Sequence, residues 1–566
     1  MKTVFISFLV LLWMVVAGQA QSKKVVVDVR QDLGSCTLLS GTNAGPIGLR
    51  SRIDYTPLYK SVGFRAVRTH DFYKAPDWYA IFPTWQADPD DPDSYDFGVS
   101  DAVIKSIVDN GFEVLFRLGS SWRGRRPEHT NDPPGTIRNE YGQIIHAADS
   151  TDFAKFANIC KHIVMHYNDG WSNGFHFNIK RWEIWNEPSL KEQFWTGTPE
   201  QFYQMFSLVA ITLKAYDPAL SIGGPGLAGH HKKAYSEGLL AYCRDHQVPL
   251  DFFSWHSYGG RLETSSPWDL ASKAREYRAL LQQYGFAETT SICDEWNAGI
   301  GSGNYADSRR GAAFYAAALT YFVQYGVAES YQYRGDDHPL GLVRSDGSLK
   351  RAANALFAWQ RLCESTHLLH TSGTDSTGFT AIASTSTDGD TLRILIANFP
   401  NTARSCSLQV IHLDSAANAE WQVIRYEGTN TPRLVPVDSF RLKNEETIHF
   451  TISISPQSMT FLEMTRQPNP TNIEKQSSPQ GFRLEQNYPN PFNPSTTICF
   501  SIPNEEHVYL DLYDLLGRRI ETLVQEYLSP GTYSVDYTGT NLSSGLYIYQ
   551  LQAGQYLARK KMAMIK

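Results

Sequence analysis

Short apolar runs alternate with longer stretches of helical period between residues 36 and 362, and this alternation limits the possible folds more than any other feature. The predicted strands are residues 37–45, 64–71, 112–119, 180–188, 220–226, 251–259, 290–299 and 330–335. Between them lie helical segments such as VSDAVIKSIVDNG and SKAREYRALLQQYG. Eight strand-then-helix units predict an α/β fold, the (β/α)₈ (TIM) barrel, with loop insertions at residues 72–98 and 120–150.

The pattern changes after residue 362. Alternating segments such as LRILIANF and WQVIRYE predict a β-sandwich over residues 363–465. Residues 466–480 are rich in Pro, Ser and Asn, which is typical of a linker, and a small sandwich-like β module follows over residues 481–566. We therefore expect a barrel over residues 21–362, an accessory sandwich, a linker and a C-terminal module.

Residues 1–20 have the features of an export signal. Lys2 precedes an apolar run over residues 5–18, and Gly18 and Ala20 are small enough for signal peptidase. Because the run is short for a membrane span, we predict a cleaved secretory signal peptide. The seven cysteines are scattered without C-x-x-C spacing, so the sequence predicts neither a disulfide framework nor a zinc site.

Composition separates some classes of partner. A net charge of −7 argues against a nucleic-acid binder, which normally carries a basic face. The 13 Trp and 30 Tyr residues fit a sugar-binding cleft, although most aromatic side chains fill cores. The acidic loop at residues 87–93 has Asp93 and Val99 where an EF-hand needs Gly and Glu, which favours a solvated loop over a calcium site.

Two glutamates close predicted barrel strands at the face where barrel active sites lie. Glu187 ends the fourth strand and Glu295 ends the seventh. Two facing carboxyl groups can cleave a glycosidic bond, because one protonates the departing oxygen and the other attacks or stabilises the anomeric carbon. We expect the aromatic residues around Glu187 to favour its protonated form. Glu183 we interpret as structural, paired with Lys180 or Arg181.

These strand ends carry a family resemblance. W-N-E-P at 185–188 and D-E-W-N at 294–297 resemble the clan A retaining glycoside hydrolases. V-R-T-H at 67–70 and DFFSWHSYG at 251–259 are similar to glycoside hydrolase family 39, which includes β-xylosidases and α-L-iduronidases. The resemblance implies that Glu187 is the general acid/base and Glu295 the nucleophile, with no metal or organic cofactor.

The resemblance also implies sugar contacts. Asn186 would bond the sugar 2-hydroxyl, and Tyr258 would orient Glu295. The residues expected to line the innermost subsite are Arg68, His70 and His256. The strand-end aromatic residues expected to stack on sugar are Trp122, Tyr331 and Tyr333. Many relatives have tryptophan where strand eight has tyrosine, so the sugar identity stays open.

The C-terminal module has its own signature. NYPNPFNPSTTICFSI, LYDLLGRRI and the basic end ARKKMAMIK resemble the type A sorting domain of the type IX secretion system. This resemblance implies two-step export to the cell surface or the medium, with the outer-membrane secretion machinery as a partner. The alternative is an accessory carbohydrate-binding module.

The sequence therefore predicts a secreted retaining exo-glycosidase, β-xylosidase-like, that acts on oligosaccharides derived from polysaccharide. One alternative is an endo-acting clan A glycanase, and another is a non-catalytic surface glycan-binding protein. The sequence contains no G-x-S-x-G and no H-E-x-x-H motif, which argues against a serine or metal hydrolase. Oligomeric state and the choice among xylose, arabinose and iduronate remain open.

Overall fold

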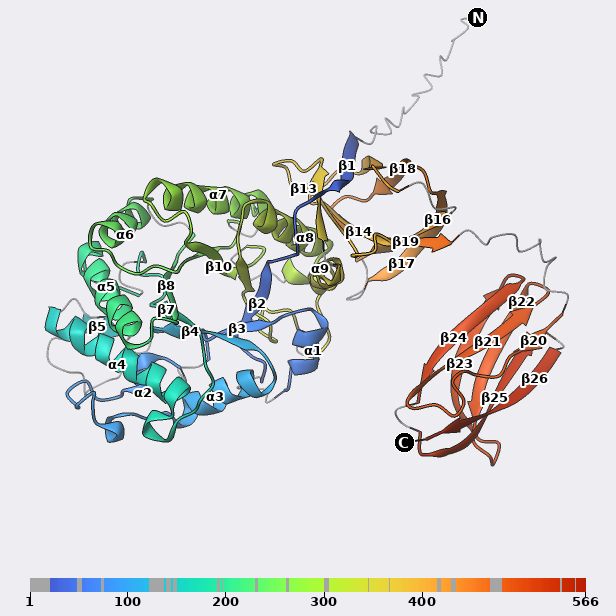
Figure 1. The fold of residues 1–566 in the computed structure, drawn as a ribbon, viewed down its shortest axis with the longest axis horizontal. Coiled ribbons are helices and arrows are strands. Elements are labelled where there is room, and N and C mark those ends of the chain that lie inside the picture. The colour runs from blue at the N-terminus through green and yellow to red at the C-terminus, as the bar shows by residue number, and fades with distance from the viewer. Residues whose placement is uncertain are drawn as a thin grey trace, which may run out of the picture. The chain divides into compact units, whose positions relative to one another are not determined.

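The chain folds into two compact units, Met1–Asn469 and Pro470–Lys566 (Figure 1). The computed structural model describes residues 21–47, 53–72, 76–121, 137–138, 144–145, 150–190, 194–195, 197–229, 233–260, 264–299, 305–344, 346–365, 367–414, 419–428, 434–468, 481–539, 542–554 and 556–565. The predicted signal peptide and most of the predicted linker lie outside these residues.

A closed barrel of eight parallel strands forms the centre of the first unit within the described residues, in the order β10-β11-β2-β3-β4-β7-β8-β9. The strands are β2 (Leu39–Asn43), β3 (Ala66–Arg68), β4 (Glu113–Leu118), β7 (Arg181–Ile184), β8 (Ser221–Leu227), β9 (Phe252–Ser257), β10 (Thr290–Trp296) and β11 (Glu329–Gln332). Each lies within one of the predicted runs or overlaps it. The prediction of a TIM barrel is confirmed.

Helices surround the barrel (Figure 1). They are α1 (Thr56–Ser61), α2 (Trp78–Ile81), α3 (Gly98–Asp109), α4 (Ser150–Asp169), α5 (Pro199–Tyr216), α6 (Lys233–Asp245), α7 (Pro267–Gln283), α8 (Arg309–Gln324) and α9 (Ala353–Glu364). The start of α5 follows from sequence, because Thr198 and Gln201 form a capping box around Pro199. None of the described helices is long and apolar enough to cross a membrane.

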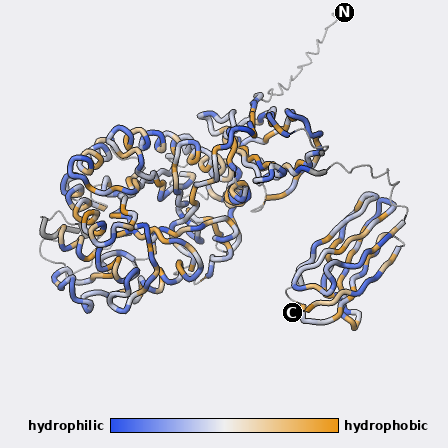
Figure 2. Tube along the Cα trace, viewed as in Figure 1, coloured by the Kyte–Doolittle hydropathy of each residue, from blue (hydrophilic) through white to orange (hydrophobic). Residues whose placement is uncertain are grey.

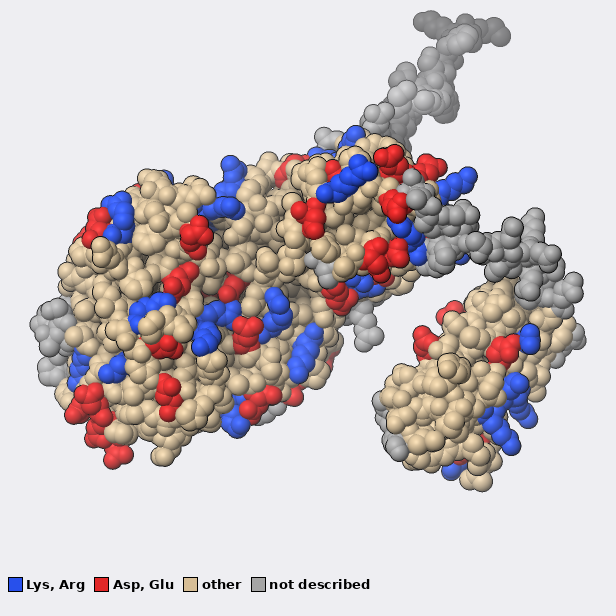
Figure 3. Space-filling model, viewed as in Figure 1, with Lys and Arg blue, Asp and Glu red and all other residues tan. Residues whose placement is uncertain are grey.

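The predicted insertions contain short elements. Residues 72–98 hold α2 and the 3₁₀ turn η1 (Pro92–Ser94), and residues 120–150 hold a hairpin of β5 (Ile137–Arg138) and β6 (Ile144–Ile145). Two further 3₁₀ turns, η2 (Trp171–Asn173) and η3 (Tyr305–Asp307), flank the barrel helices α4 and α8. Lys and Arg side chains lie among Asp and Glu side chains over the visible face of this unit (Figure 3).

An apolar layer fills the lower part of the barrel interior. Its members are Leu39, Ala66, Leu115, Phe252, Ile292 and Tyr331. The expectation that Tyr331 stacks on sugar is therefore wrong. Its ring is fully buried in this layer, and its hydroxyl donates to Glu329 Oε2 at 2.6 Å.

The second part of the first unit is a sheet of nine described strands, in the order β17-β16-β19-β14-β13-β12-β1-β15-β18. They are β1 (Gln21–Asp32), β12 (His367–Ser372), β13 (Phe379–Thr385), β14 (Thr391–Asn398), β15 (Arg404–Ile411), β16 (Ala419–Glu427), β17 (Val435–Lys443), β18 (Thr447–Ile454) and β19 (Ser458–Pro468). Leu408 of β15 and Trp421 of β16 belong to one core although their strands lie near opposite ends of the sheet. The sheet must therefore fold over on itself.

The N-terminal strand β1 corrects the expected domain boundary. It pairs in parallel with β15 and antiparallel with β12, so residues 21–32 belong to the sandwich sheet and not to the barrel. Helix α8 packs against β13, β14 and β19, and Leu395 and Phe461 share the apolar core of the barrel unit. Barrel and sandwich are thus joined by a common core.

The C-terminal unit has two sheets within its described residues. One contains β20 (Arg483–Leu484), β21 (Ser495–Ile502) and β24 (Gly531–Thr538), and the other contains β23 (Arg519–Leu528), β22 (Glu506–Tyr513), β25 (Gly545–Ala553) and β26 (Tyr556–Met564). Buried and exposed residues alternate along β21, as one half-buried face requires. Hydrophobic and hydrophilic stretches alternate along these strands in Figure 2.

A disulfide joins Cys36, just before β2, to Cys363 near the end of α9. Their Cα atoms are 5.3 Å apart, although the two residues are 327 positions apart in sequence. The other five cysteines, all within the described residues, are free. Cysteine spacing did not predict this pair, because the fold brings together two segments that are remote in sequence.

We predict that replacing Cys36 and Cys363 together by Ser lowers the free energy of unfolding of the first unit by about 2–4 kcal/mol, because the cross-link restricts the unfolded chain. All tryptophans lie within residues 1–469, so denaturation followed by tryptophan fluorescence reports this unit. Cys499→Ser, in the C-terminal unit, is the control. A midpoint that does not change in the double variant would contradict the prediction.

Candidate active site

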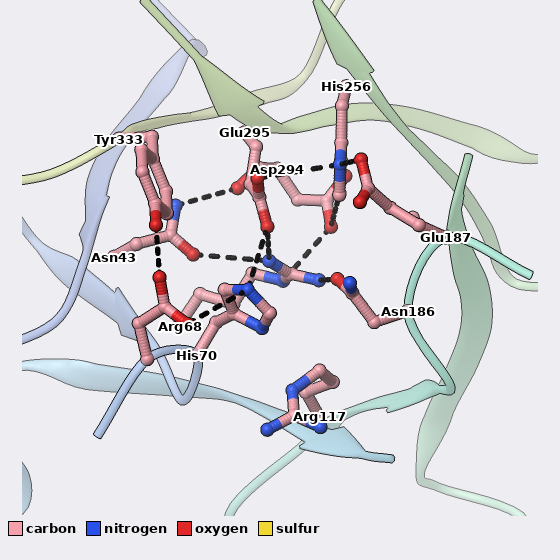
Figure 4. A network of polar contacts seen from close by, with 12 residues as sticks. Asn43, Arg68, His70, Arg117, Asn186, Glu187, His256, Asp294, Glu295 and Tyr333 are labelled. Atoms are coloured by element: carbon pink, nitrogen blue, oxygen red, sulfur yellow. Dashed lines mark hydrogen bonds and ion pairs between the residues drawn. The ribbon is translucent and has the colours of Figure 1, made fainter. Parts of the chain in front are cut away.

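Glu187 and Glu295 face each other at the mouth of the barrel (Figure 4). Glu295 lies in β10, and Glu187 follows β7 by three positions. Three atoms lie within 4.8 Å of one another: one carboxylate oxygen of Glu187, one carboxylate oxygen of Glu295 and one ring nitrogen of His256. The side chain of Glu187 is 16% exposed and that of Glu295 is 5% exposed. The pair is therefore more open to solvent on the Glu187 side.

A sharp turn after β7 places Glu187. Trp185 and Glu187 have positive φ angles of 76° and 45°, which cost on the order of 1 kcal/mol or more for residues other than glycine. The Glu187 N–H donates to Gly226 O at 3.0 Å, which holds the turn. The indole of Trp185 points away from the site, because its Nε1–H donates to Phe194 O at 3.0 Å.

The expectation that aromatic side chains surround the carboxylate of Glu187 is wrong. The Trp182 ring stacks on Phe116, and the Trp185 ring meets Trp195 edge-on, both within the buried core. The carboxylate of Glu187 instead contacts the imidazole of His256, with Oε1 2.8 Å from Nδ1.

Arg68 connects Glu295 to its surroundings. Its guanidinium is fully buried at the end of β3. Nη1 donates to Glu295 Oε1 at 2.7 Å and to Asn43 Oδ1 at 3.1 Å. Nη2 donates to Asn186 Oδ1 at 2.7 Å. One rigid cation thus fixes both the carboxylate of Glu295 and the amide of Asn186 (Figure 4).

Other polar groups complete the contacts of Glu295. The Tyr258 hydroxyl donates to Oε2 at 2.7 Å, and His70 Nε2 lies 3.3 Å from Oε1. His256 Nδ1 lies 3.5 Å from Oε2, so this imidazole is close to both glutamates. Hydrogen bonds to both oxygens leave the Glu295 carboxylate one orientation.

The two histidines have opposite electrostatic settings. Burial and the charge of Arg68 hold the pKa of His70 well below its ordinary value. Burial also disfavours the charged form of His256, but Glu295, Asp294 and Glu187 together raise its pKa well above the ordinary value. At neutral pH His70 is therefore neutral and His256 is an imidazolium. Burial raises the pKa of Glu295, and the charges of His256 and Arg68 oppose that rise.

The spacing of Glu187, His256 and Glu295 is also that of a metal site, the only such group within the described residues. An imidazolium has no lone pair on Nδ1, and the Arg68 cation already contacts Glu295. This donor set disfavours a second cation. In the acidic loop, Asp90 accepts from Asn158 Nδ2 at 2.9 Å and Asp91 caps η1, so these carboxylates are used by the protein itself.

Sequence comparison with known proteins identifies the family. The model described as "Glycosyl hydrolases family 39" matches residues 14–334, which is more than half of the chain. The chain belongs to glycosyl hydrolase family 39. A second model, "Secretion system C-terminal sorting domain", matches residues 486–566. The predicted family and the predicted sorting domain are confirmed.

Individual proteins similar to this chain include two β-xylosidases and a glucosidase of known structure. A β-xylosidase of Geobacillus stearothermophilus is 23% identical over 307 residues, which cover 51% of this chain and 58% of that protein. A β-xylosidase of Caldicellulosiruptor saccharolyticus is 26% identical over 168 residues, covering 29% of this chain and 31% of that protein. The chain therefore matches about half, or less, of these proteins. A glucosidase structure from Croceicoccus marinus is 26% identical with a TM-score of 0.61, covering 79% of this chain and 99% of that one.

The structure brings most of the expected site residues of this family 39 chain together. Those within the polar network around Glu295 are Arg68, His70, Asn186, Glu187, His256 and Tyr258. Tyr333 lies at the edge of this network, with its hydroxyl donating to Asp71 and its ring centroid 5.8 Å from that of Tyr258. Trp122 lies outside the described residues.

Sequence reasoning missed three members of the network. Asn43 ends β2 and its Nδ2 donates to Asp294 O at 2.9 Å. Asp294 itself contacts Arg68, and Asp71 accepts from Tyr333. The sequence contained a signal for them, because Asp71 ends a predicted strand, Asn43 lies two positions before the end of another, and Asp294 begins the D-E-W-N motif. The expected partner of Glu183 was wrong, since Glu183 binds Arg68 while Arg181 pairs with Glu113 and Glu329.

We predict that Arg68→Met lowers kcat/KM for aryl glycosides by roughly a hundredfold or more, because Glu295 and Asn186 lose their common donor. The substitution also leaves buried carboxylates uncompensated, which costs about 3–5 kcal/mol of unfolding free energy. Kinetics and urea denaturation measure the two effects. Lys105→Gln removes an exposed ion pair with Asp109 and is the control. Wild-type kinetics in the Arg68 variant would contradict the account.

Proposed function

We propose that the chain is an exported retaining exo-glycosidase that removes terminal β-xylosyl residues from oligosaccharides. The observation that carries the proposal is the short separation of the two glutamates, whose nearest relevant oxygens lie within 4.8 Å. Retaining enzymes place their carboxyl groups about 5–5.5 Å apart, whereas inverting enzymes leave about 6.5–9.5 Å for a water molecule. The spacing supports attack by Glu295 itself.

In the first step Glu295 attacks the anomeric carbon while Glu187 gives its proton to the departing oxygen. Arg68, Tyr258 and His70 hold the attacking carboxylate in one orientation. In the second step Glu187 takes a proton from water, which attacks the anomeric carbon and releases Glu295. The partial exposure of Glu187 suits this exchange, since the water must arrive on its side.

Asn186 supports a contact to the sugar 2-hydroxyl. Its Oδ1 accepts from Arg68, so the amide orientation is fixed. Its Nδ2 is buried and has no hydrogen-bond partner among the described residues. A buried donor without a partner is costly, and a sugar hydroxyl would satisfy it. Such a contact stabilises the transition state when it strengthens as the anomeric carbon becomes positive.

The C-terminal sorting domain indicates export by the type IX system to the cell surface or the extracellular space. We propose that residues 1–20 direct the first step across the inner membrane. The outer-membrane secretion machinery would then recognise residues 486–566. The segment between the two compact units, near residue 470, is where we place release of the sorting domain.

The preference for β-xylosides rests on the similarity to β-xylosidases. A panel of nitrophenyl glycosides, with proton NMR of the first-formed sugar, tests sugar identity and stereochemistry together. We expect fastest turnover of the β-xyloside, with the β-anomer formed first. Inversion would refute the mechanism, and activity only on internal bonds of a polymer would favour the endo-acting alternative. Binding without turnover would favour a glycan-binding protein.

We predict different leaving-group dependence for variants of the two glutamates. Glu295→Gln should lose roughly 10⁴-fold or more in kcat/KM with every leaving group, because the nucleophile is absent. Glu187→Gln should lose about 10²–10⁴-fold with a poor leaving group and little in kcat/KM with dinitrophenolate, which departs without a proton. Steady-state kinetics over a series of phenol leaving groups measures this. Equal losses in both variants across the series would contradict the assigned roles.

A further inference from the structure

Glu183 and Asp294 form a second pair of carboxyl groups, which the glycosidase mechanism does not use. Both side chains are fully buried inside the barrel. Glu183 Oε2 lies 2.7 Å and Asp294 Oδ2 lies 2.9 Å from the same atom, Nε of Arg68. On β10, Asp294 lies two positions after Ile292 of the apolar layer and directly before Glu295, and Glu183 contacts the same Arg68 that binds Glu295.

The contacts of this pair are unequal. Glu183 Oε1 accepts from the Ser254 hydroxyl at 2.6 Å. Among the described residues, neither oxygen of Asp294 has an N–H or O–H donor in good hydrogen-bond geometry, although its Oδ2 is near Arg68 Nε and lies 3.4 Å from His256 Nε2. Two anionic oxygens that converge on one N–H repel each other, and a proton between them removes the repulsion.

The surrounding charges are too few for two anions here. Arg68 already meets Glu295 through Nη1, so it would face three buried carboxylates. The imidazolium of His256 is shared among Asp294, Glu187 and Glu295. On the neighbouring strand β4, the guanidinium of Arg117 turns to Asp77 and does not neutralise Glu183. A buried charge that lacks a partner strongly destabilises the fold.

We propose that Glu183 and Asp294 share one proton, which resides on Glu183, and that this singly charged pair positions Arg68 against the ionised Glu295. The inference rests on the proposed function. The Glu183 hydroxyl then donates to Asp294, which gains the donor it lacks. Asp294 remains the anion that balances Arg68, and Glu183 is a positioning residue because it touches neither sugar nor the reacting atoms.

The electrostatic setting agrees with this assignment. Burial, opposed by Arg68 and reinforced by Asp294, raises the pKa of Glu183 to about 8. For Asp294, burial is outweighed by the charges of Arg68 and His256, and its pKa falls to about 2. Above about pH 8 the pair would therefore carry two charges. Arg68 would then be drawn away from Glu295, and hydrolysis would slow.

The test is the alkaline side of the pH profile of kcat/KM for a dinitrophenyl glycoside. This leaving group needs no proton, so Glu187 does not set the profile. We expect wild-type kcat/KM to fall about tenfold per pH unit above roughly pH 8. Glu183→Gln, which is neutral at every pH, should remove this fall and lose no more than about tenfold at pH 6. Asp294→Asn should lose roughly a hundredfold or more at pH 6, because Arg68 loses its balancing charge.

The control is Glu329→Gln, a carboxylate on β11 that pairs with Arg181 outside the site and should leave the profile unchanged. If Glu183→Gln does not fold, infrared spectroscopy of the Glu187→Gln protein replaces it. A protonated-carboxyl band that persists at pH 7 and disappears near pH 8 supports the shared proton, and its absence at pH 7 overturns it.

The outcomes separate the inference from the proposed function. An alkaline fall that persists in Glu183→Gln, in an enzyme that still depends on Glu295, overturns the shared proton alone. So does a larger loss in Glu183→Gln than in Asp294→Asn at pH 6. A wild-type protein without any Glu295-dependent hydrolysis refutes the proposed function instead.

Discussion

The site depends on the contacts that the guanidinium of Arg68 makes with the residues around it. It is fully buried, and its three nitrogen atoms reach Glu183, Asp294, Glu295, Asn43 and Asn186, which come from three other barrel strands or their ends. An isolated cation in such a position would cost several kcal/mol, so the barrel must supply acceptors in fixed places. The same contacts that compensate Arg68 fix the orientation of Glu295, the proposed nucleophile. In the proposed mechanism, stability and catalysis therefore use one network.

The barrel makes this network possible because it places strand ends from distant parts of the sequence in one ring. The apolar layer below excludes water, which strengthens each ionic contact above it. Glu187 differs from the other carboxyl groups, since it lies beyond the strand on a strained turn and is partly exposed. The proposed acid/base, which exchanges protons with water, is thus held at the edge of the network, and the proposed nucleophile is held inside it.

Much of this could be predicted from sequence, but only where the signal is local. The barrel strands were predictable because each is a short apolar run between helical segments, and Glu187 and Glu295 because they end such runs. The position of β1 in the sandwich sheet could not be predicted, because its parallel partner β15 lies about 380 residues away and a local sequence pattern does not identify the strand with which it pairs. The expected partners of Glu183 were its sequence neighbours Lys180 and Arg181, whereas the cation that binds it is Arg68, which comes from a different strand, β3. Tyr331 and Tyr333 are two positions apart in one predicted strand, but Tyr331 lies in β11 within the apolar layer, whereas Tyr333 follows β11 and donates to Asp71.

The central claim is that Glu295 forms a covalent bond with the sugar from within this network. Incubation with a 2-deoxy-2-fluoro glycoside carrying a good leaving group, followed by mass spectrometry of peptic peptides, tests it most directly. The account predicts a mass increase of one fluoroglycosyl group on the peptide that contains Glu295, and protection by a competing sugar. Labelling of a different carboxylate, or turnover of the natural substrate with no labelling at all, would contradict it.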